Sequence, residues 1–283
     1  MLERGMRVGE AKRKKEAAAV KAARAKRVLT AIEEVGIPIP TGMEYSDPRL
    51  VDAARTAGKL LDLAFDVMEK SNARANSVPV MTGLAMQLHG NLDYLLDHIV
   101  NNGGSPVSVG CHEGCAWCCH QNVEVSILEA ILIAVETAHD ERGTKFDERS
   151  QSLLSLSDRE RAVQGEPCPF LDDRNKCSIY KVRPVACRSY LAPDPRQCES
   201  SFRLAKEGHE SETQFYAEPQ ISGTAFKAVL DAMAFDFGYQ HDLVDLVSTV
   251  ATIRKDPSII ERWLSGEKVF EPKSHDSHFV QTT

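Results

Sequence analysis

The chain has 283 residues, of which 42% are hydrophobic, and a formal net charge of −7 at neutral pH. This length accommodates one large domain or two small ones, and the apolar fraction suffices for a core without cross-links. Arg, Lys and Glu interrupt the first twenty residues, which therefore do not resemble a signal peptide. The longest apolar run, Ile127–Val135, is too short for a membrane span and contains Glu129, so we expect a soluble, cytoplasmic protein without membrane contact.

Residues 1–36 are predicted to form a basic, flexible N-terminal arm. Up to Arg27 the chain carries ten Lys or Arg and three Asp or Glu, which leaves a charge of −14 for the remainder. Such an arm can contact nucleic acid or an acidic partner. Because it contains no interleaved aromatic residues and the rest of the chain is acidic, we favour a solvated helix over nucleic-acid binding.

Residues 37–104 are predicted to form a helical hairpin. Asp47 and Pro48 provide an N-cap and a first-turn proline, and apolar residues then recur at helical spacing to about Lys70. A second helix follows Pro79 and ends at Asn101-Asn-Gly-Gly. Two amphipathic helices joined by a short connection indicate an antiparallel pair.

Residues 105–205 contain all eight cysteines and are predicted to form a metal-binding domain. Four of them lie within nine residues, in the run Cys111-His-Glu-Gly-Cys115-Ala-Trp-Cys118-Cys119, and the others are Cys168, Cys177, Cys187 and Cys198. Thiolates at short spacing are the ligands of soft and borderline metals. In the cytoplasm such clusters are more often ligands than disulfides. We therefore predict that all eight are metal ligands.

Two further features of this domain are visible in its pattern. Ser126 and Glu129 have the spacing of a capping box that opens a helix through about His139. Between Gly165 and Gln197 the chain is rich in Pro, Asp and Arg and has little apolar periodicity, so we expect that segment to fold only around bound metal.

Residues 206–265 are predicted to be C-terminal helices. One apolar stripe ends at Phe237, a second runs from Leu243 to Ile253, and a short last helix begins at Asp256-Pro257. Residues 266–283 are polar and are expected to be a disordered tail. Neither an alternation of strands and helices nor an internal repeat is visible. The predicted fold class is mainly α, with the helical hairpin and the C-terminal helices around a loop-rich cysteine centre.

The cysteines stand in two blocks with a recognisable order. The first is the run from Cys111 to Cys119, and the second comprises Cys168-Pro-Phe-Leu, Cys177-Ser-Ile-Tyr and Arg183-Pro-Val-Ala-Cys187-Arg. Together they resemble the zinc- or iron-chelating cysteine-cluster family, often called the YkgJ family. The resemblance implies iron or zinc binding. Members are often labelled iron–sulfur oxidoreductases, and a similar module occurs in bacterial flagellin lysine N-methylases. It implies no reaction here, because no methyl-donor or substrate site is matched.

The distribution of the eight thiols has two solutions. Four thiolates satisfy a tetrahedral zinc ion or a [4Fe–4S] cluster, so the chain could form two four-thiolate sites or one site with spare thiols. Adjacent Cys118 and Cys119 project in different directions and need not share an ion. Zinc usually favours two Cys-x2-Cys knuckles, and only Cys115 and Cys118 have that spacing. We therefore predict an iron–sulfur cluster, with zinc as the alternative.

Several neighbours of the cysteines are candidates for supporting roles. His112 and His120 could replace a thiolate, although a histidine beside a cysteine loop is more often solvated. Arg183 and Arg188 either compensate the charge of an anionic cluster or form ordinary salt bridges. Two tyrosines are expected to pack over the cluster and shield it from water, Tyr180 and Tyr190.

Three classes of function remain open. We favour a non-catalytic metal-binding protein with a structural, redox or sensing role. The second class is a redox enzyme or an accessory of protein modification, with a possible protein partner, and the third is a binding module that uses the basic arm. Cys111-x3-Cys115-x-Trp117-Cys118 also matches the loop of radical-SAM enzymes, but no strand–helix repeats follow it to build their barrel. A disulfide-stapled domain is disfavoured by the adjacent cysteines and the expected compartment. No reaction can be assigned.

Overall fold

The structure is a computed structural model, and it describes residues 19, 23, 26–33, 44, 46–70, 77–102, 108–209, 213 and 215–273, with backbone alone for 61, 63–70, 77 and 102. Most of the predicted basic arm and residues 274–283 of the predicted tail lie outside these ranges. The described part is mainly helical, as predicted. Its strands are β1 (Glu124–Ser126) and β2 (Leu243–Asp245), which pair antiparallel with Ser126 opposite Leu243. No helix among the described residues is long and apolar enough to cross a bilayer.

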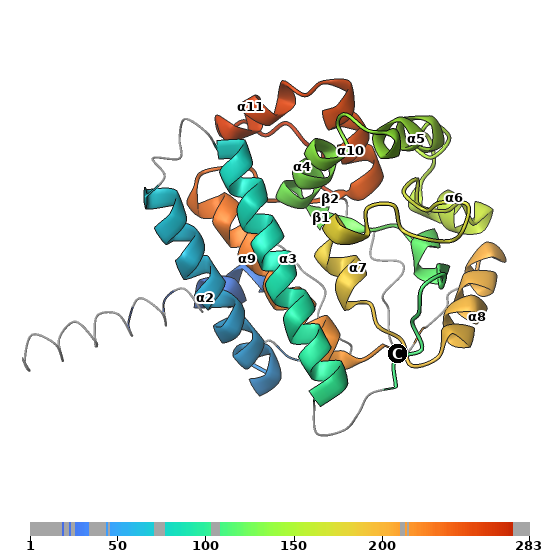
Figure 1. The fold of residues 1–283 in the computed structure, drawn as a ribbon, viewed down its shortest axis with the longest axis horizontal. Coiled ribbons are helices and arrows are strands. Elements are labelled where there is room, and N and C mark those ends of the chain that lie inside the picture. The colour runs from blue at the N-terminus through green and yellow to red at the C-terminus, as the bar shows by residue number, and fades with distance from the viewer. Residues whose placement is uncertain are drawn as a thin grey trace, which may run out of the picture.

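Three long helices form one side of the molecule, as Figure 1 shows: α2 (Pro48–Lys70), α3 (Ser77–Asn102) and α9 (Ala217–Asp236). α2 and α3 run antiparallel, as the hairpin prediction requires. However, α2 makes its most extensive contacts with α9, which also packs against α3. α9 is buried around nearly its whole circumference and is therefore the central helix. The two predicted hairpin helices share one hydrophobic core with the rest of the chain.

Two of the predicted helix starts, at Asp47 and at Ser126, are confirmed by their capping contacts, whereas α3 (Ser77–Asn102) begins before Pro79 and α11 (Ile259–Leu264) begins after Pro257. The Asp47 carboxylate accepts a hydrogen bond from the Arg49 amide at 2.8 Å, and α2 begins at Pro48. α4 (Ile127–Glu136) begins with a reciprocal capping box: the Glu129 amide donates to Ser126 Oγ at 3.3 Å, and the Ser126 amide donates to Glu129 Oε2 at 3.0 Å. These contacts satisfy amides that the first turn of a helix leaves without partners.

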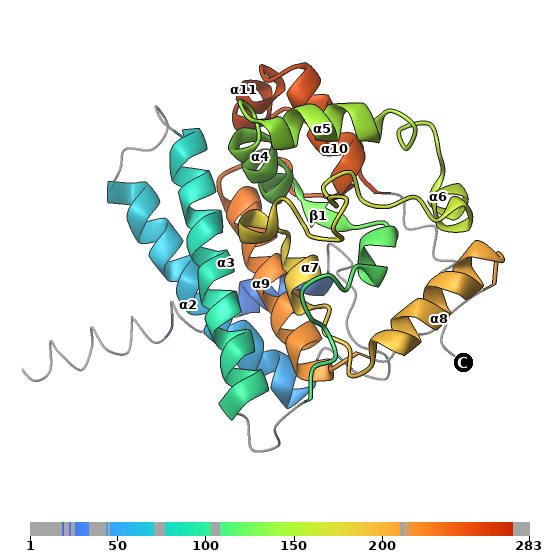
Figure 2. The same cartoon turned by 45° about the vertical axis from the view of Figure 1, so that its right-hand side comes forward.

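The upper part of Figures 1 and 2 contains α4, α5 (Glu141–Ser150), α10 (Leu246–Lys255) and α11 (Ile259–Leu264). The prediction that Leu243 begins a helical stripe is wrong, because Leu243 lies in β2. The reason is that Asp245 caps α10 by accepting from the Ser248 amide at 2.9 Å, so the helix starts after this residue. The three residues before α10, Leu243–Asp245, are extended and pair with β1.

Two segments predicted to be flexible or disordered pack onto the core where they are described. Residues 26–33 are helical and bury Val28 and Ile32, and the Arg27 guanidinium lies 3.8 Å from the centre of the Phe235 ring. In the tail, Phe270 is buried and its amide donates to Gln240 Oε1 at 3.0 Å. A few apolar residues in a polar stretch are enough to anchor these described parts, while the predictions for the whole arm and the whole tail stay predictions.

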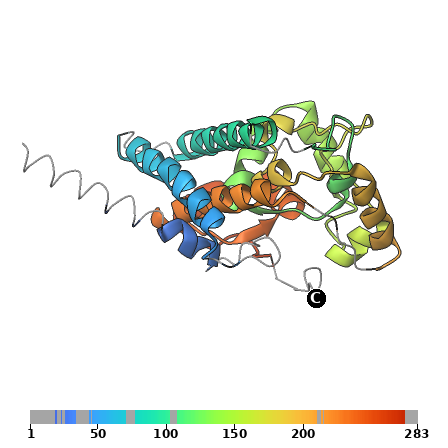
Figure 3. The same ribbon diagram turned by 90° about the horizontal axis from the view of Figure 1, so that it is seen from below.

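The cysteine-bearing segments lie on the side of the molecule opposite α2, as the views in Figures 2 and 3 show. They comprise η2 (Trp117–His120), η3 (Tyr180–Val182), α7 (Val185–Ser189) and α8 (Pro195–Lys206), with α6 (Asp158–Gln164) beside α8. The expectation that Gly165–Gln197 folds only around bound metal stays a prediction, although the segment does contain apolar anchors. Four of its apolar residues belong to the core, namely Phe170, Ile179, Val182 and Val185.

Candidate metal centre

The first cysteine block is shaped by short turns. The Cys115 amide donates to the His112 carbonyl at 3.0 Å, with Gly114 at φ +89°, and Cys118 and Cys119 follow in η2. The loop contacts a segment that is distant in the sequence, because the Ala192 amide donates to Cys111 Sγ at 3.4 Å. The first block therefore contacts the segment between Cys187 and Cys198.

The thiols of the second block lie on separate segments, and one of these segments contacts the first block directly. The Cys168 amide donates to the Cys119 carbonyl at 2.7 Å, which joins the two blocks directly. Cys177 pairs with Leu171 in a β-bridge, across a turn in which Asp172 accepts from the Lys176 amide at 2.8 Å. The remaining two thiols are carried by helices, Cys187 by α7 and Cys198 by α8.

Four thiols, which we name the outer thiols, are electrostatic neighbours: Cys111, Cys115, Cys118 and Cys198. Burial, together with negative charge on the other three, raises the pKa of Cys198 to about 11. Burial and the charges of Cys111 and Cys118 likewise raise the pKa of Cys115. Because such effects weaken with distance, they place Cys198 of α8 beside the first block.

The other four thiols, which we name the inner thiols, are linked by effects of their charges on one another: Cys119, Cys168, Cys177 and Cys187. Burial raises the pKa of Cys168 to about 12, with a further contribution from Cys177. Burial and then the charges of Cys168, Cys118 and Cys177 raise the pKa of Cys187 well above its ordinary value. At both Cys168 and Cys187, burial therefore favours the protonated thiol over the thiolate.

Cys118 connects the two sets. A side-chain hydrogen bond with Cys119 lowers the pKa of Cys118 to about 7 and raises that of Cys119. The eight thiols are all free and partly exposed. No three Cys, His, Asp or Glu side chains in the described part converge as a formed metal site. The thiols are thus neighbours rather than a preformed cage, and side-chain rotations are needed to bring four onto one ion.

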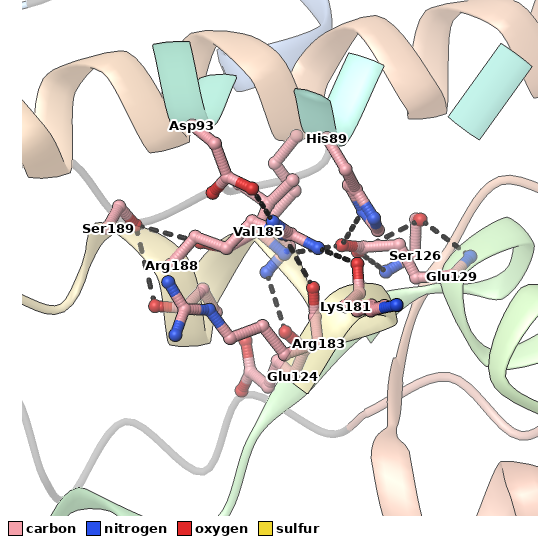
Figure 4. Close-up of polar contacts among 12 residues, drawn as sticks. His89, Asp93, Glu124, Ser126, Glu129, Lys181, Arg183, Val185, Arg188 and Ser189 are labelled. Carbon is pink, nitrogen blue, oxygen red and sulfur yellow. Dashed lines mark hydrogen bonds and ion pairs between the residues drawn. The ribbon is translucent and has the colours of Figure 1, made fainter. Parts of the chain in front are cut away.

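The two arginines have different roles. Arg188 is 2% exposed and pairs with Asp93 of α3, and its Nε donates to the Arg183 carbonyl at 2.8 Å (Figure 4). It thereby ties α7 to α3, which is the structural alternative considered for it. The positive charge of Arg183 contributes, after the Cys119 hydrogen bond, to the lowered pKa of Cys118. At Cys177, where burial raises the pKa, the charges of Arg183 and Arg188 partly oppose that rise. The buried Nε of Arg183 has no hydrogen-bond partner among the described residues. The thiol region therefore contains a cation that can compensate thiolate charge.

The predicted aromatic shield is half correct. Tyr180 is 61% exposed and stacks on the Arg183 guanidinium at 3.8 Å, so it does not shield the thiols. Tyr190 is partly buried, and burial, with smaller effects from Cys118 and Cys198, raises its pKa. Of the histidines, His112 is exposed, while His120 Nδ1 lies 2.9 Å from the Gly165 carbonyl oxygen.

Glu129 has a role that its sequence pattern does not reveal. Besides capping α4, its Oε1 accepts from the Val185 amide at 2.6 Å and contacts His89 Nε2 at 3.3 Å (Figure 4). Glu129 and His89 are both fully buried. Val185 opens α7, so this carboxylate anchors the helix that presents Cys187. The available signal was His89 within the apolar stripe of α3, where a buried imidazole requires a polar partner.

The fold and the site define a class of protein: a helical protein that carries a thiol-rich metal-binding domain. Residues 110–216 match the protein-family model CxxCxxCC, described as "Putative zinc- or iron-chelating domain". The chain therefore carries a domain of this cysteine-cluster family, and the resemblance inferred from the two cysteine blocks is confirmed. The match contains all eight cysteines. Searches of curated proteins and of solved structures found no match.

Proposed function

We propose that the chain is a metal-binding protein whose outer and inner thiols form two four-thiolate sites. The observation that carries this proposal is the separation of the thiols into two sets of neighbours. The charges of Cys111, Cys115 and Cys118 act on Cys198 of α8, and those of Cys168 and Cys187 act on Cys119, while Cys118 lies between the two sets. Each set supplies the four thiolates that a tetrahedral zinc ion or a cubane cluster requires.

The residues present fit such a metal. Thiolate is the preferred ligand of zinc and of iron–sulfur clusters. Several thiolates close together repel one another, and Arg183 with its unpaired Nε supplies a positive charge beside both sets. A metal would replace the protons that burial keeps on the inner thiols.

Between the two candidate cofactors we favour a [4Fe–4S] cluster at the outer thiols. Cys111, Cys115 and Cys118 are spaced as a loop that holds three corners of a cubane, and Cys198 provides the fourth thiol from a distant helix. This fourth thiol also argues against a radical-SAM enzyme, whose cluster keeps one iron open for the cofactor. When bound, the cluster would supply a one-electron redox centre or an oxygen-sensitive structural clamp.

The proposed role is structural or sensing rather than catalytic. All the thiols of each set are needed as ligands, which leaves no separate nucleophile at the site. An enzyme or accessory of protein modification remains the alternative, with the cysteine-cluster domain as its redox or structural part. We propose a cytoplasmic location, where iron–sulfur centres and reduced thiols persist.

The test is anaerobic purification followed by metal and sulfide analysis and a visible spectrum. Two four-thiolate sites predict about two zinc ions or about eight irons per chain, with absorption near ~400 nm for clusters. Cys198→Ser and Cys177→Ser form a matched pair, because each removes one thiol from one set. Each variant should lose about half of the metal, while His112→Ala, at an exposed site, should lose none.

The variants also distinguish the alternatives. If either serine variant abolished all metal binding, one shared centre would replace the two-site proposal. Full metal content in both variants would show that these thiols are not ligands. Colourless protein with stoichiometric zinc would show that the metal is zinc and not iron, and the proposal of two four-thiolate sites would still hold.

A further inference from the structure

We propose that α8 is a flap that metal at the outer thiols holds closed. The inference rests on the proposed function, because it requires Cys198 to bind metal together with Cys111, Cys115 and Cys118. It adds a consequence of that binding: the metal controls the position of one helix. The supporting observations concern the base of α8, its seat and its lack of core contacts.

The segment that contains α8 leaves and rejoins the rest of the fold at one place, which we name its base, and main-chain hydrogen bonds hold the chain together there. The Tyr216 amide donates to the Leu191 carbonyl at 3.0 Å, and the Gly110 amide donates to the Ala192 carbonyl at 3.0 Å. Gly110 is necessary there, because a Cβ atom would lie 2.6 Å from the Pro193 carbonyl oxygen. The base is thus held by main-chain hydrogen bonds. α8 begins immediately afterwards with Asp194 as N-cap and Pro195 in the first turn, where Pro195 Cδ also lies against Gly110.

The surface on which α8 packs, which we name its seat, is small and is formed by residues beside the thiols. The Phe202 ring lies 5.4 Å from the ring of Trp117 and 4.6 Å from that of His120, measured between centroids. On the other side of the ring, α6 ends at Gly165, where a Cβ atom would lie 3.0 Å from Phe202 Cζ. Cys198 and Phe202 are four residues apart, so both face η2.

The remaining contacts of α8 are its packing against α6 and a hydrogen bond from Thr213 Oγ1 to Ser201 Oγ at 2.7 Å. Among the described residues, it contributes none to the hydrophobic core, and its one buried residue is Ser201. The neighbouring segment differs, because Phe170, Ile179 and Val185 anchor it in the core. A helix of 12 residues is marginal in isolation. Figures 1 and 2 show α8 at the periphery, far from α2 and α3.

Metal at the outer thiols would therefore join α8 to the loop that carries the other three ligands. Cys198 is the only thiol on α8, so a single metal–thiolate bond would add to the two ring contacts of Phe202 and the hydrogen bond of Ser201. Loss of the metal removes this bond and leaves only the contacts of Phe202 and Ser201 and the packing against α6, none of which reaches the hydrophobic core. α8 then opens, which exposes Trp117 and the outer thiols while the core remains folded. Binding or loss of the metal thereby changes which side chains are exposed at the surface.

Peptide-resolved hydrogen exchange of the whole chain tests the flap. Wild-type protein is compared after loading with Zn²⁺ or after anaerobic cluster reconstitution, and after metal removal by a chelator. Loading should slow amide exchange in 195–206 by about 100-fold when free zinc is about a hundred times its dissociation constant, and should change α9 little. In Cys198→Ser the exchange of α8 should stay fast whether or not metal is present. Arg203→Ser is the matched control, since Arg203 pairs on the surface with Glu199 at 2.7 Å.

The outcomes separate the flap from the proposed function. Metal bound at full stoichiometry with unchanged exchange in α8 would overturn the flap and leave the metal sites intact. Absence of metal binding would overturn the proposed function, and with it the flap. Should Cys198→Ser not fold, Phe202→Leu keeps every thiol and weakens only the seat. Its metal-free form should exchange about tenfold faster in α8 than metal-free wild type, and an unchanged rate would refute the role of the seat.

Discussion

Replacing Glu129 by Gln tests whether this buried carboxylate joins the helical core to the cysteine domain. Its Oε2 accepts from the Ser126 amide at 3.0 Å and from Ser126 Oγ at 3.1 Å. Its Oε1 accepts from the Val185 amide at 2.6 Å and contacts His89 Nε2 at 3.3 Å. A glutamine has only one acceptor oxygen, so in either orientation its NH2 group faces a backbone N–H donor.

The expected cost follows from these contacts. A buried donor left without an acceptor costs about 1–3 kcal/mol, and the lost hydrogen bonds were made to a charged group, which strengthens them. We expect the free energy of unfolding of Glu129→Gln to fall by about 2–3 kcal/mol. For a chain of this size that corresponds to a melting temperature lower by about 4–12 °C.

Thermal and urea unfolding of metal-free protein measure this difference, with Glu136→Gln as a control at an exposed position of the same helix. Burial alone would raise the pKa of Glu129, but the hydrogen bond and charge of His89 and the Val185 amide lower it overall. A lowered pKa gives stability above the ordinary value of 4.5 that is lost as the pH falls further. The gap between wild type and variant should therefore narrow below that pH. A destabilisation of less than about 0.5 kcal/mol at pH 7 would refute the reasoning.

Three further predictions concern other parts of the structure. Asp231 is buried, neither of its oxygens has a hydrogen-bond partner among the described residues, and burial raises its pKa well above 3.8. A raised pKa lowers the stability of the folded state as the pH rises. The free energy of unfolding of Asp231→Asn should therefore increase relative to that of wild type between about pH 4 and 8, and a difference in melting temperature that does not change with pH would contradict this. Burial raises the pKa of Cys168 to about 12 and that of Cys198 to about 11, so metal binding must displace protons. Competition titrations should show affinity rising about tenfold per pH unit for each proton released, and a pH-independent affinity would refute proton displacement. Gly165 has φ +68° and adjoins Phe202, so Gly165→Ala should cost about 1–2 kcal/mol and speed exchange in α8, whereas Gly83→Ala, with open space around its Cβ, should not.

The sequence alone determined the features that depend on residues close together in the chain. The capping box of Ser126 and Glu129 and the helix start at Asp47 involve contacts over two or three residues, and both are present as predicted. The cysteine spacing identified the metal-binding family for the same reason, because the loop from Cys111 to Cys119 is a local motif. Mainly α structure followed from helical periodicity over long segments.

Only the tertiary structure decided which distant segments meet. Leu243 extends because β1, more than a hundred residues earlier, offers it a partner. Glu129 became an anchor of α7 because the fold brings the Val185 amide to its free oxygen. The neighbours of Cys198 depend on the return of the chain at Leu191 and Tyr216, which places α8 on η2. Such contacts combine small energies between residues far apart in sequence, and no local pattern encodes them.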